Sequence, residues 1–209
     1  MIIAIDGSAA SGKGTLAKRL ATHLGLSYLD TGALYRAVGL QLLNAGQEPQ
    51  NINENQCVNL CFELDIALTT SPLIRSEKVA EMASVVAAMP AVRAALLDLQ
   101  RQFAATPPDP KGAILDGRDI GTVVLPRADF KFFIDADINT RAERRTKELL
   151  QEGQSVMFRD VLTDMQERDS RDRSRSAAPL RPANDAISID TSSMDADDVL
   201  ALALSHITL

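Results

Sequence analysis

Short apolar runs alternate along the chain with longer stretches in which apolar residues recur at helical spacing. Ile2–Ile5 is wholly apolar and mostly β-branched, which predicts a short buried strand. From Lys13 to Leu24 the apolar residues recur at the spacing of a helix face. Similar short runs predict further strands at 27–29, 113–115, 131–135 and 187–190.

Helical patterns fill the intervals between these strands. They predict helices from Thr31 to near Gly46, at 53–65, at 75–104 with a break at Pro90, at 139–151, from 156 onward and from Asp195. Residues 66–74 have the composition of a turn. Apart from the helical stretch between the second and third strands, strands alternate with helices. The predicted fold is therefore α/β, a five-stranded parallel sheet wrapped by helices, within one domain of residues 1–209.

The segment between the first strand and the first helix has the pattern G-x-x-x-x-G-K. Its glycines let the backbone curl closely around a ligand, and the backbone N–H groups of the loop and of the helix N-terminus suit phosphate oxygens. A glycine-rich turn with a solvated Lys13 is the alternative, but the strand–loop–helix context favours phosphate binding. The residues expected to take part are Gly7, Ser8, Ala9, Ala10, Ser11, Gly12, Lys13, Gly14 and Thr15. Gly-Lys-Gly-Thr is the variant seen in nucleoside-monophosphate kinases.

Polar residues follow three of the predicted strands. In an open parallel sheet, ligands bind outside the carboxyl ends of the strands, so the phosphate loop, Asp30-Thr31 and 116–119 are expected to face one cleft. Acidic side chains at this edge suit Mg²⁺, and basic ones suit phosphate. We expect Asp116 to bind Mg²⁺ through water; a helix cap or turn residue is the alternative.

A dense run of charges occupies residues 167–175. On a helix, Arg168, Asp172 and Arg175 would share a face, with Arg171 alongside. Arginine cannot lose its charge, and its planar fork matches phosphate. A solvated face with local ion pairs is the ordinary interpretation of such a run. Given the phosphate loop, we favour a mobile lid that supplies positive charge and excludes water.

Composition narrows the class of partner. The chain of 209 residues is 45% hydrophobic and 24% charged, which is ordinary for a globular protein. Its net charge of −6 argues against binding a nucleic acid polymer. Without a long apolar run, and with the first strand at the N-terminus, we expect no membrane span, no signal peptide and a cytoplasmic location. Cys57 and Cys61 are expected to be reduced core thiols rather than zinc ligands.

Several of these segments together resemble the bacterial cytidylate kinase family. The matching motifs lie between residues 2 and 180, in the family's order. They are Gly-Ser-Ala-Ala-Ser-Gly-Lys-Gly-Thr, Leu-Asp-Thr-Gly-Ala-Leu-Tyr-Arg, Ile-Arg-Ser-Glu-Lys-Val, Asp-Gly-Arg-Asp-Ile-Gly-Thr-Val-Val-Leu-Pro and Glu-Arg-Asp-Ser-Arg-Asp-Arg-Ser-Arg-Ser-Ala-Ala-Pro-Leu.

The resemblance implies a role for each matching residue. Residues 7–15 would hold the phosphates of ATP, with Mg²⁺, and Arg171 and Arg173 would contribute on the ATP side. A second set of residues would bind CMP. Thr31, Tyr35 and Arg36 would line its site, and Arg36 and Arg118 would contact its phosphate. Arg75 and Asp119 would contact the cytosine edge, and Asp172 would hold a ribose hydroxyl. Arg168 and Arg175 would clamp the phosphates. Lys13, Arg118, Arg168 and Arg175 would be the catalytic residues.

The resemblance also implies a CMP-binding region at about 31–104 and a lid at about 153–178. The family usually has a longer stretch with a small sheet between Ile66 and Ile74, where this chain keeps only residues 67–73. This departure leaves the strictness of CMP over UMP open. A monomer is expected.

The resulting expectation is an enzyme of pyrimidine nucleotide metabolism. It would transfer the γ-phosphoryl group of ATP directly, in line, to CMP or dCMP. The alternatives are a kinase of another small acceptor such as UMP, and a regulatory module that binds ATP without transfer.

Overall fold

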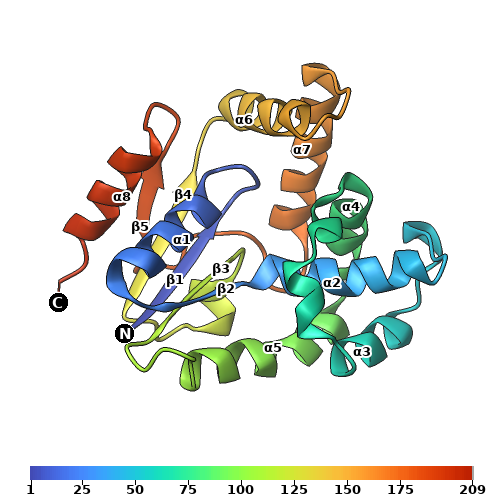
Figure 1. Cartoon of the computed structure of the whole chain (residues 1–209), viewed down its shortest axis with the longest axis horizontal. Helices are drawn as coiled ribbons and strands as arrows, with labels where there is room; N and C mark the ends of the chain where they lie inside the picture. Colours follow the sequence, from blue (N-terminus) through green and yellow to red (C-terminus); the bar gives the residue numbers. More distant parts are fainter. Residues whose placement is uncertain (209) are drawn as a thin grey trace. The chain divides into compact units, whose positions relative to one another are not determined.

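The computed structural model, which describes residues 1–208, contains one five-stranded sheet among these residues (Figure 1). The strand order is β2-β3-β1-β4-β5, and the pairs of β1 with β3, β1 with β4 and β4 with β5 are parallel. The strands are β1 (Ile2–Gly7), β2 (Ser27–Asp30), β3 (Ala113–Gly117), β4 (Phe130–Asp135) and β5 (Ile187–Asp190). The predicted α/β class with a five-stranded parallel sheet is confirmed.

The central position of β1 follows from its sequence. A strand covered on both faces needs apolar side chains on both, and Ile3, Ala4 and Ile5 are all fully buried. Across the sheet, Asp6 is in register with Gly117 of β3, and Gly7 with Ile134 of β4. The carboxyl ends of the three middle strands therefore lie at one level.

The helices begin and end close to the residues that the sequence predicted. They are α1 (Lys13–Leu24), α2 (Thr31–Asn44), α3 (Glu54–Phe62), α4 (Glu77–Val86), α5 (Pro90–Ala105), α6 (Ile138–Gln151), α7 (Phe158–Ser174) and α8 (Ala196–Ser205). Local capping explains several boundaries. The Asp30 carboxylate accepts from the N–H of Ala33 at 3.1 Å, which starts α2 directly after β2, and Asp195 forms a capping box with Asp198 on α8.

Two segments differ from the prediction. The stretch read as a turn forms two short 3₁₀ helices, η2 (Ile66–Thr70) and η3 (Pro72–Arg75), so α4 begins only at Glu77, after its N-cap Ser76. Residues after β3 form a π-helical turn, η4 (Ile120–Val124), which no sequence pattern indicated.

The chain divides into two compact units, residues 1–29 with 107–209, and residues 30–106. We call them the sheet unit and the inserted unit. In the sheet unit, α1 and α8 pack with the strands in one apolar core, and α6 and α7 form a hairpin around a second apolar cluster (Figure 1). The inserted unit has its own core from α2 to α5, which includes Cys57 and Cys61. Both cysteines are free, and burial raises the pKa of the Cys61 thiol to about 11.

Within residues 1–208, no helix taken singly has the length and apolarity to cross a membrane. One bent pair, α4 with α5 at an angle of 100°, meets those requirements on length and composition alone.

Candidate active site

The loop between β1 and α1 has the backbone shape that the glycine pattern predicted. Gly7 has a φ of +158°, and a Cβ there would lie 2.0 Å from the Ile134 carbonyl oxygen, so only glycine fits. Gly12, the N-cap of α1, has a φ of +90° and is left-handed, as is Ala10 with a φ of 56°. Gly12 has no side chain with which to cap the first turn of α1. The N–H groups of that turn are therefore placed to receive an anion.

Side chains outside the loop hold its carbonyl groups. Arg141 Nη1 donates to the carbonyl oxygen of Ala9 at 3.3 Å, and Thr191 Oγ1 donates to that of Ser11 at 2.9 Å. Arg144 in turn donates to Thr191 Oγ1 at 3.0 Å and to the Thr191 carbonyl oxygen at 2.6 Å. With these carbonyls engaged, the orientation of the corresponding peptide groups is set before any ligand arrives.

Two hydroxyl groups of the loop also lack protein partners. Ser8 Oγ and Ser11 Oγ are buried, and neither has a hydrogen-bond partner among the described residues. Buried polar atoms of this kind call for an explanation, and a phosphate group in the loop would supply acceptors. Lys13 is half-buried and opens α1, which agrees with a cation directed at such a phosphate.

The carboxylate of Asp116 lies directly beside the loop. Asp116 is 3% exposed near the end of β3, and a Cβ on Gly14 would lie 3.2 Å from its Oδ2. Glycine after Lys13 thus leaves the room that this carboxylate occupies. No group of three or more His, Cys, Asp and Glu residues suited to a metal occurs within 1–208. One carboxylate beside a phosphate loop still fits Mg²⁺, which usually takes one or two carboxylates together with water and phosphate oxygens.

Asp6, near the end of β1, holds the segment that follows two predicted site residues, and the sequence interpretation missed it. It is 3% exposed, and its two carboxylate oxygens accept from the N–H groups of Ile120 and Gly121, each at 2.7 Å. These bonds fasten η4, which directly follows Arg118 and Asp119. Burial raises the pKa of the Asp6 carboxyl to about 6, although both N–H groups act in the opposite direction. Its only signal in the sequence is an acidic residue ending a buried strand.

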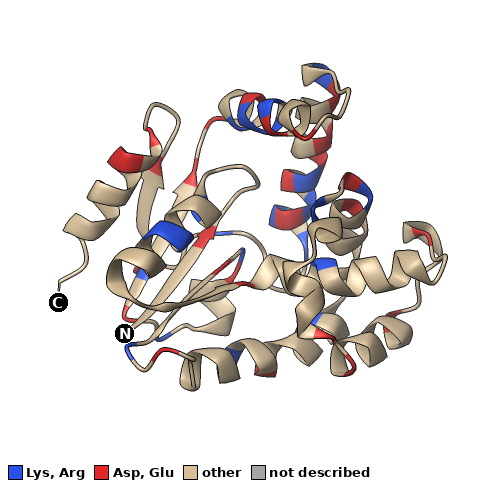
Figure 2. Ribbon diagram, viewed as in Figure 1, with Lys and Arg blue, Asp and Glu red and all other residues tan. Residues whose placement is uncertain are grey.

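Three of the predicted arginines gather around Asp172 on α7. Arg118 Nε donates to Asp172 Oδ2 at 2.8 Å, and Arg175 Nη1 lies 3.8 Å from Oδ1. Burial alone would raise the pKa of the Asp172 carboxyl, but the charges of Arg118, Arg168 and Arg175 lower it. We call these four residues the arginine cluster. Figure 2 shows acidic and basic residues closely interleaved along α7.

The expectation that Arg175 continues the face of one helix is wrong. Helix α7 ends at Ser174, and Arg175 is its C-cap in an extended conformation. The reason is a chain reversal in which the N–H of Leu180 donates to the Asp172 carbonyl oxygen at 2.8 Å. Arg175 still approaches Asp172 because its Nε donates to the Ala178 carbonyl oxygen at 2.7 Å, which turns its side chain inward.

The other predicted residues of the sheet unit lie at its surface or beside η4. Arg171 is exposed, and Arg173 Nη2 lies 3.4 Å from Oδ2 of Asp135 at the end of β4. Asp119 is 4% exposed and is the N-cap of η4, where its carbonyl oxygen accepts from the N–H of Val123 at 2.9 Å. Thr15 is exposed on the first turn of α1.

The inserted unit brings its four predicted residues to the start of α2 and to η3. Thr31 and Tyr35 are buried on the first turns of α2. Arg36 Nη1 donates to the Ile74 carbonyl oxygen at 3.0 Å. Arg75 follows Ile74, and its Nη2 lies 3.5 Å from Oδ2 of Asp30. Two separate sequence motifs thus form one polar corner within this unit.

The raised pKa of Asp6 predicts a particular pH dependence of stability. An ordinary Asp ionises near 3.8, whereas folded Asp6 ionises at about 6, so the folded state binds the proton more tightly between these values. This contribution to stability is complete below about pH 4 and is lost as the pH rises through 6. We expect the unfolding free energy of the wild type minus that of Asp6→Asn to fall by about 3 kcal/mol between about pH 4 and 7.

Urea unfolding at a series of pH values measures this difference. Asp185→Asn is the matched control, because a hydrogen bond from Lys131 lowers the pKa of the Asp185 carboxyl. Its contribution is present above the ordinary pKa and is lost as the pH falls, so the corresponding difference changes in the opposite direction and at lower pH. A difference for Asp6→Asn that stays constant from pH 4 to 7 would contradict the assignment.

The chain is similar to known proteins along nearly its whole length. A family model described as cytidylate kinase matches residues 3–209. Over 207 residues the chain is 54% identical to the cytidylate kinase of Paramagnetospirillum magneticum, covering 99% of this chain and 97% of that protein. It is 52% identical over 205 residues to the cytidylate kinase of Rhodospirillum rubrum, covering 98% and 95%. A solved structure of an uncharacterized protein from Eubacterium ventriosum has the same fold, with a TM-score of 0.55 at 17% identity, covering 99% and 98%.

Proposed function

This chain belongs to the cytidylate kinase family and acts as a phosphotransferase on CMP, and on that premise we propose which residues bind each substrate and how transfer proceeds. The observation that carries the proposal is the uncapped N-terminus of α1 behind a loop with left-handed Gly12. Residues 7–15 hold the β- and γ-phosphates of ATP there, and Lys13 adds a positive charge on the transferred group.

Asp116 would hold Mg²⁺ through water on the donor side. When bound, Mg²⁺ would offset the negative charge of the donor phosphates during phosphoryl transfer. The support for this role is the buried carboxylate directly beside Gly14 at the start of α1.

The arginine cluster stabilises the phosphoryl group during its transfer. Arg118, Arg168 and Arg175 carry positive charge around one buried carboxylate, and Asp172 keeps their side chains together before phosphate arrives. A transferred phosphoryl group spreads charge over its equatorial oxygens, so preorganised cations lower the barrier. We also assign Asp172 to a ribose hydroxyl. Arg171 and Arg173 act on the ATP side of the lid, at about 153–178.

The residues that we assign to CMP are described separately for each unit. In the inserted unit, whose CMP-binding region is about 31–104, Thr31 and Tyr35 line the site, Arg36 contacts the phosphate and Arg75 contacts the base. Arg118 contacts the CMP phosphate, and Asp119 accepts from the exocyclic amine of cytosine. The support is local: Arg36 donates to the carbonyl oxygen of Ile74, the residue before Arg75, and Asp6 fastens η4 next to Asp119.

Transfer is direct. An oxygen of the CMP phosphate attacks the γ-phosphorus of ATP, the bond from that phosphorus to the β-phosphate bridging oxygen breaks, and CDP and ADP form. This chain supplies positioning, positive charge and exclusion of water rather than a covalent intermediate. We propose that the enzyme works as a monomer in the cytoplasm and uses dCMP as well.

A coupled ADP-release assay across an acceptor panel tests the proposal. With ATP and Mg²⁺, we expect rapid turnover with CMP and dCMP, slower turnover with UMP, and none without acceptor. UMP offers a carbonyl oxygen where Asp119 needs a donor, and an unpaired buried group costs affinity. Equal rates with CMP and UMP would refute the role of Asp119. ATP binding without transfer to any acceptor would instead support the regulatory module.

A further inference from the structure

A buried arginine outside the predicted site contacts three segments of the sheet unit. Arg141, on the first turn of α6, is 3% exposed. Its Nε donates to the carbonyl oxygen of Ala136, the residue after β4, at 2.8 Å. The same Nε lies 3.7 Å from Oδ1 of Asp135, the last residue of β4. Its Nη1 donates to the Ala9 carbonyl oxygen at 3.3 Å, and its Nη2 donates to Asp169 Oδ2 at 2.6 Å. One guanidinium thus joins β4, the phosphate loop and α7.

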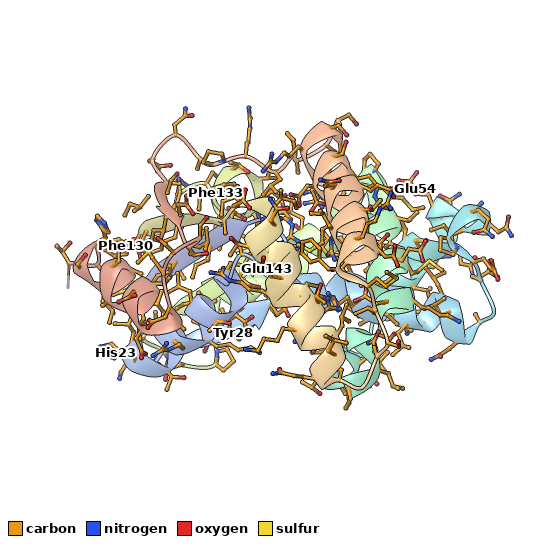
Figure 3. All side chains as sticks on the ribbon, turned by 90° about the horizontal axis from the view of Figure 1, so that it is seen from above. His23, Tyr28, Glu54, Phe130, Phe133 and Glu143 are labelled. Carbon is orange, nitrogen blue, oxygen red and sulfur yellow. The ribbon has the colours of Figure 1, made fainter. Side chains whose placement is uncertain are left out.

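Apolar packing also links the phosphate loop to the hairpin of α6 and α7. Ala9 and Ala10 of the phosphate loop pack against the cluster that holds the α6–α7 hairpin together, whose buried members are Ala142, Leu149, Val161 and Met165. Figure 3 shows α6, which carries the labelled Glu143, alongside α7. The phosphate loop and the hairpin are therefore joined both by a charged contact and by apolar contacts.

Asp169 lies on the part of α7 that carries the arginine cluster. It follows Arg168 directly and precedes Asp172 by nearly one helical turn. Asp169 is 8% exposed, and a buried charge that loses its partner costs several kcal/mol. The pair of Arg141 and Asp169 consequently stabilises the position that α7 has in this structure relative to the Ala9 carbonyl group.

We propose that Arg141 is a positioning residue, which sets the distance between the phosphate loop and the arginine cluster by holding Ala9 and Asp169 at once. Its hydrogen bonds are made to Ala136, Ala9 and Asp169, so we assign it a role that acts through the elements it joins. The proposal rests on the proposed function, because it assigns the loop to the donor phosphates and the cluster to the transferred group. Misplacement of catalytic groups by about 1 Å can cost roughly 100-fold in rate, so such a residue affects turnover as well as stability.

The variants Arg141→Lys and Asp169→Asn separate the contact of Arg141 with Ala9 from its contact with Asp169. Arg141→Lys keeps the charge but lacks the fork that reaches three segments. Asp169→Asn keeps an acceptor oxygen, weakens the contact with α7 and leaves the Ala9 contact in place. The matched control is Arg19→Lys, since Arg19 pairs with Asp197 at the surface of the same unit and has no assigned role.

The measurements are kcat and KM for ATP and for CMP, ATP affinity at equilibrium, and the thermal midpoint. We expect Arg141→Lys to lower kcat roughly tenfold and to raise KM for ATP roughly fivefold, with KM for CMP within about twofold. We expect Asp169→Asn to lower kcat by a similar factor with KM for ATP nearly unchanged. The double variant is expected to be no slower than Arg141→Lys, since both changes break one connection. Arg19→Lys should match the wild type.

Several outcomes would overturn the proposal. A lower thermal midpoint with unchanged kcat and KM in Arg141→Lys would make Arg141 a structural residue only, and additive losses in the double variant would exclude a shared connection. If Arg141→Lys does not fold, wild-type kcat in Asp169→Asn refutes the coupling on its own. Absence of transfer by the wild-type enzyme would refute the proposed function instead, which the acceptor panel detects separately.

Discussion

Replacing Lys13 with alanine is expected to lower kcat about a thousandfold while the fold stays intact. Lys13 opens α1 at the uncapped helix terminus, where its ammonium group would meet the charge that develops on the transferred phosphoryl group. The core contacts of α1 come from other residues, including the buried Leu16 and Leu20. Truncating the half-buried Lys13 therefore removes charge without opening a cavity in that core.

The assay for Lys13→Ala is ADP release at saturating ATP and CMP, with circular dichroism and thermal unfolding to verify the fold. Lys18→Ala is the matched control, because Lys18 lies on the exposed face of the same helix. It should retain the wild-type rate, which separates loss of this one cation from a change in helix charge. Near-wild-type turnover of folded Lys13→Ala would mean that the loop does not hold the transferred phosphate.

The second large effect is expected from Arg118→Lys, with kcat/KM for CMP lowered roughly 100-fold. Arg118 is largely buried, and its Nε already donates to Asp172. Burial alone would lower the pKa of Arg118, but the neighbouring Asp172 raises it above the ordinary value. Its planar fork leaves further N–H groups for the CMP phosphate while Nε holds Asp172. A lysine ammonium group keeps the charge but cannot reproduce that fixed geometry.

Steady-state kinetics with CMP varied at saturating ATP measure this loss. Arg127→Lys, an exposed arginine a few residues beyond η4, is the control and should behave as the wild type. A preserved charge should keep the stability of Arg118→Lys close to that of the wild type, so the thermal midpoint separates loss of binding from loss of fold. Unchanged kcat/KM for CMP would show that Arg118 serves only as the partner of Asp172.

Local chemistry made much of this protein predictable from its residues alone. The strand, glycine loop and helix from Ile2 to Leu24 are contiguous, so their apolar spacing and their glycines specify them without any distant partner. The start of α2 follows from the Asp30 cap, and the order of strands and helices indicates the parallel sheet. The placement of Arg118 at the carboxyl end of β3 also follows from the order of strands and helices.

Tertiary packing decided which charged groups meet. Asp6 fastens η4 across 114 positions, and Arg141 reaches Asp169 across 28. In the sequence, Arg141 and Asp169 lie in charged helical stretches, where solvent exposure of the side chains is the ordinary expectation. Arg175 reaches Asp172 only because the chain reverses after α7. Local spacing reports which face of an element is apolar, whereas the partner of a buried charge depends on which distant oxygen or nitrogen the folded chain brings within hydrogen-bonding distance.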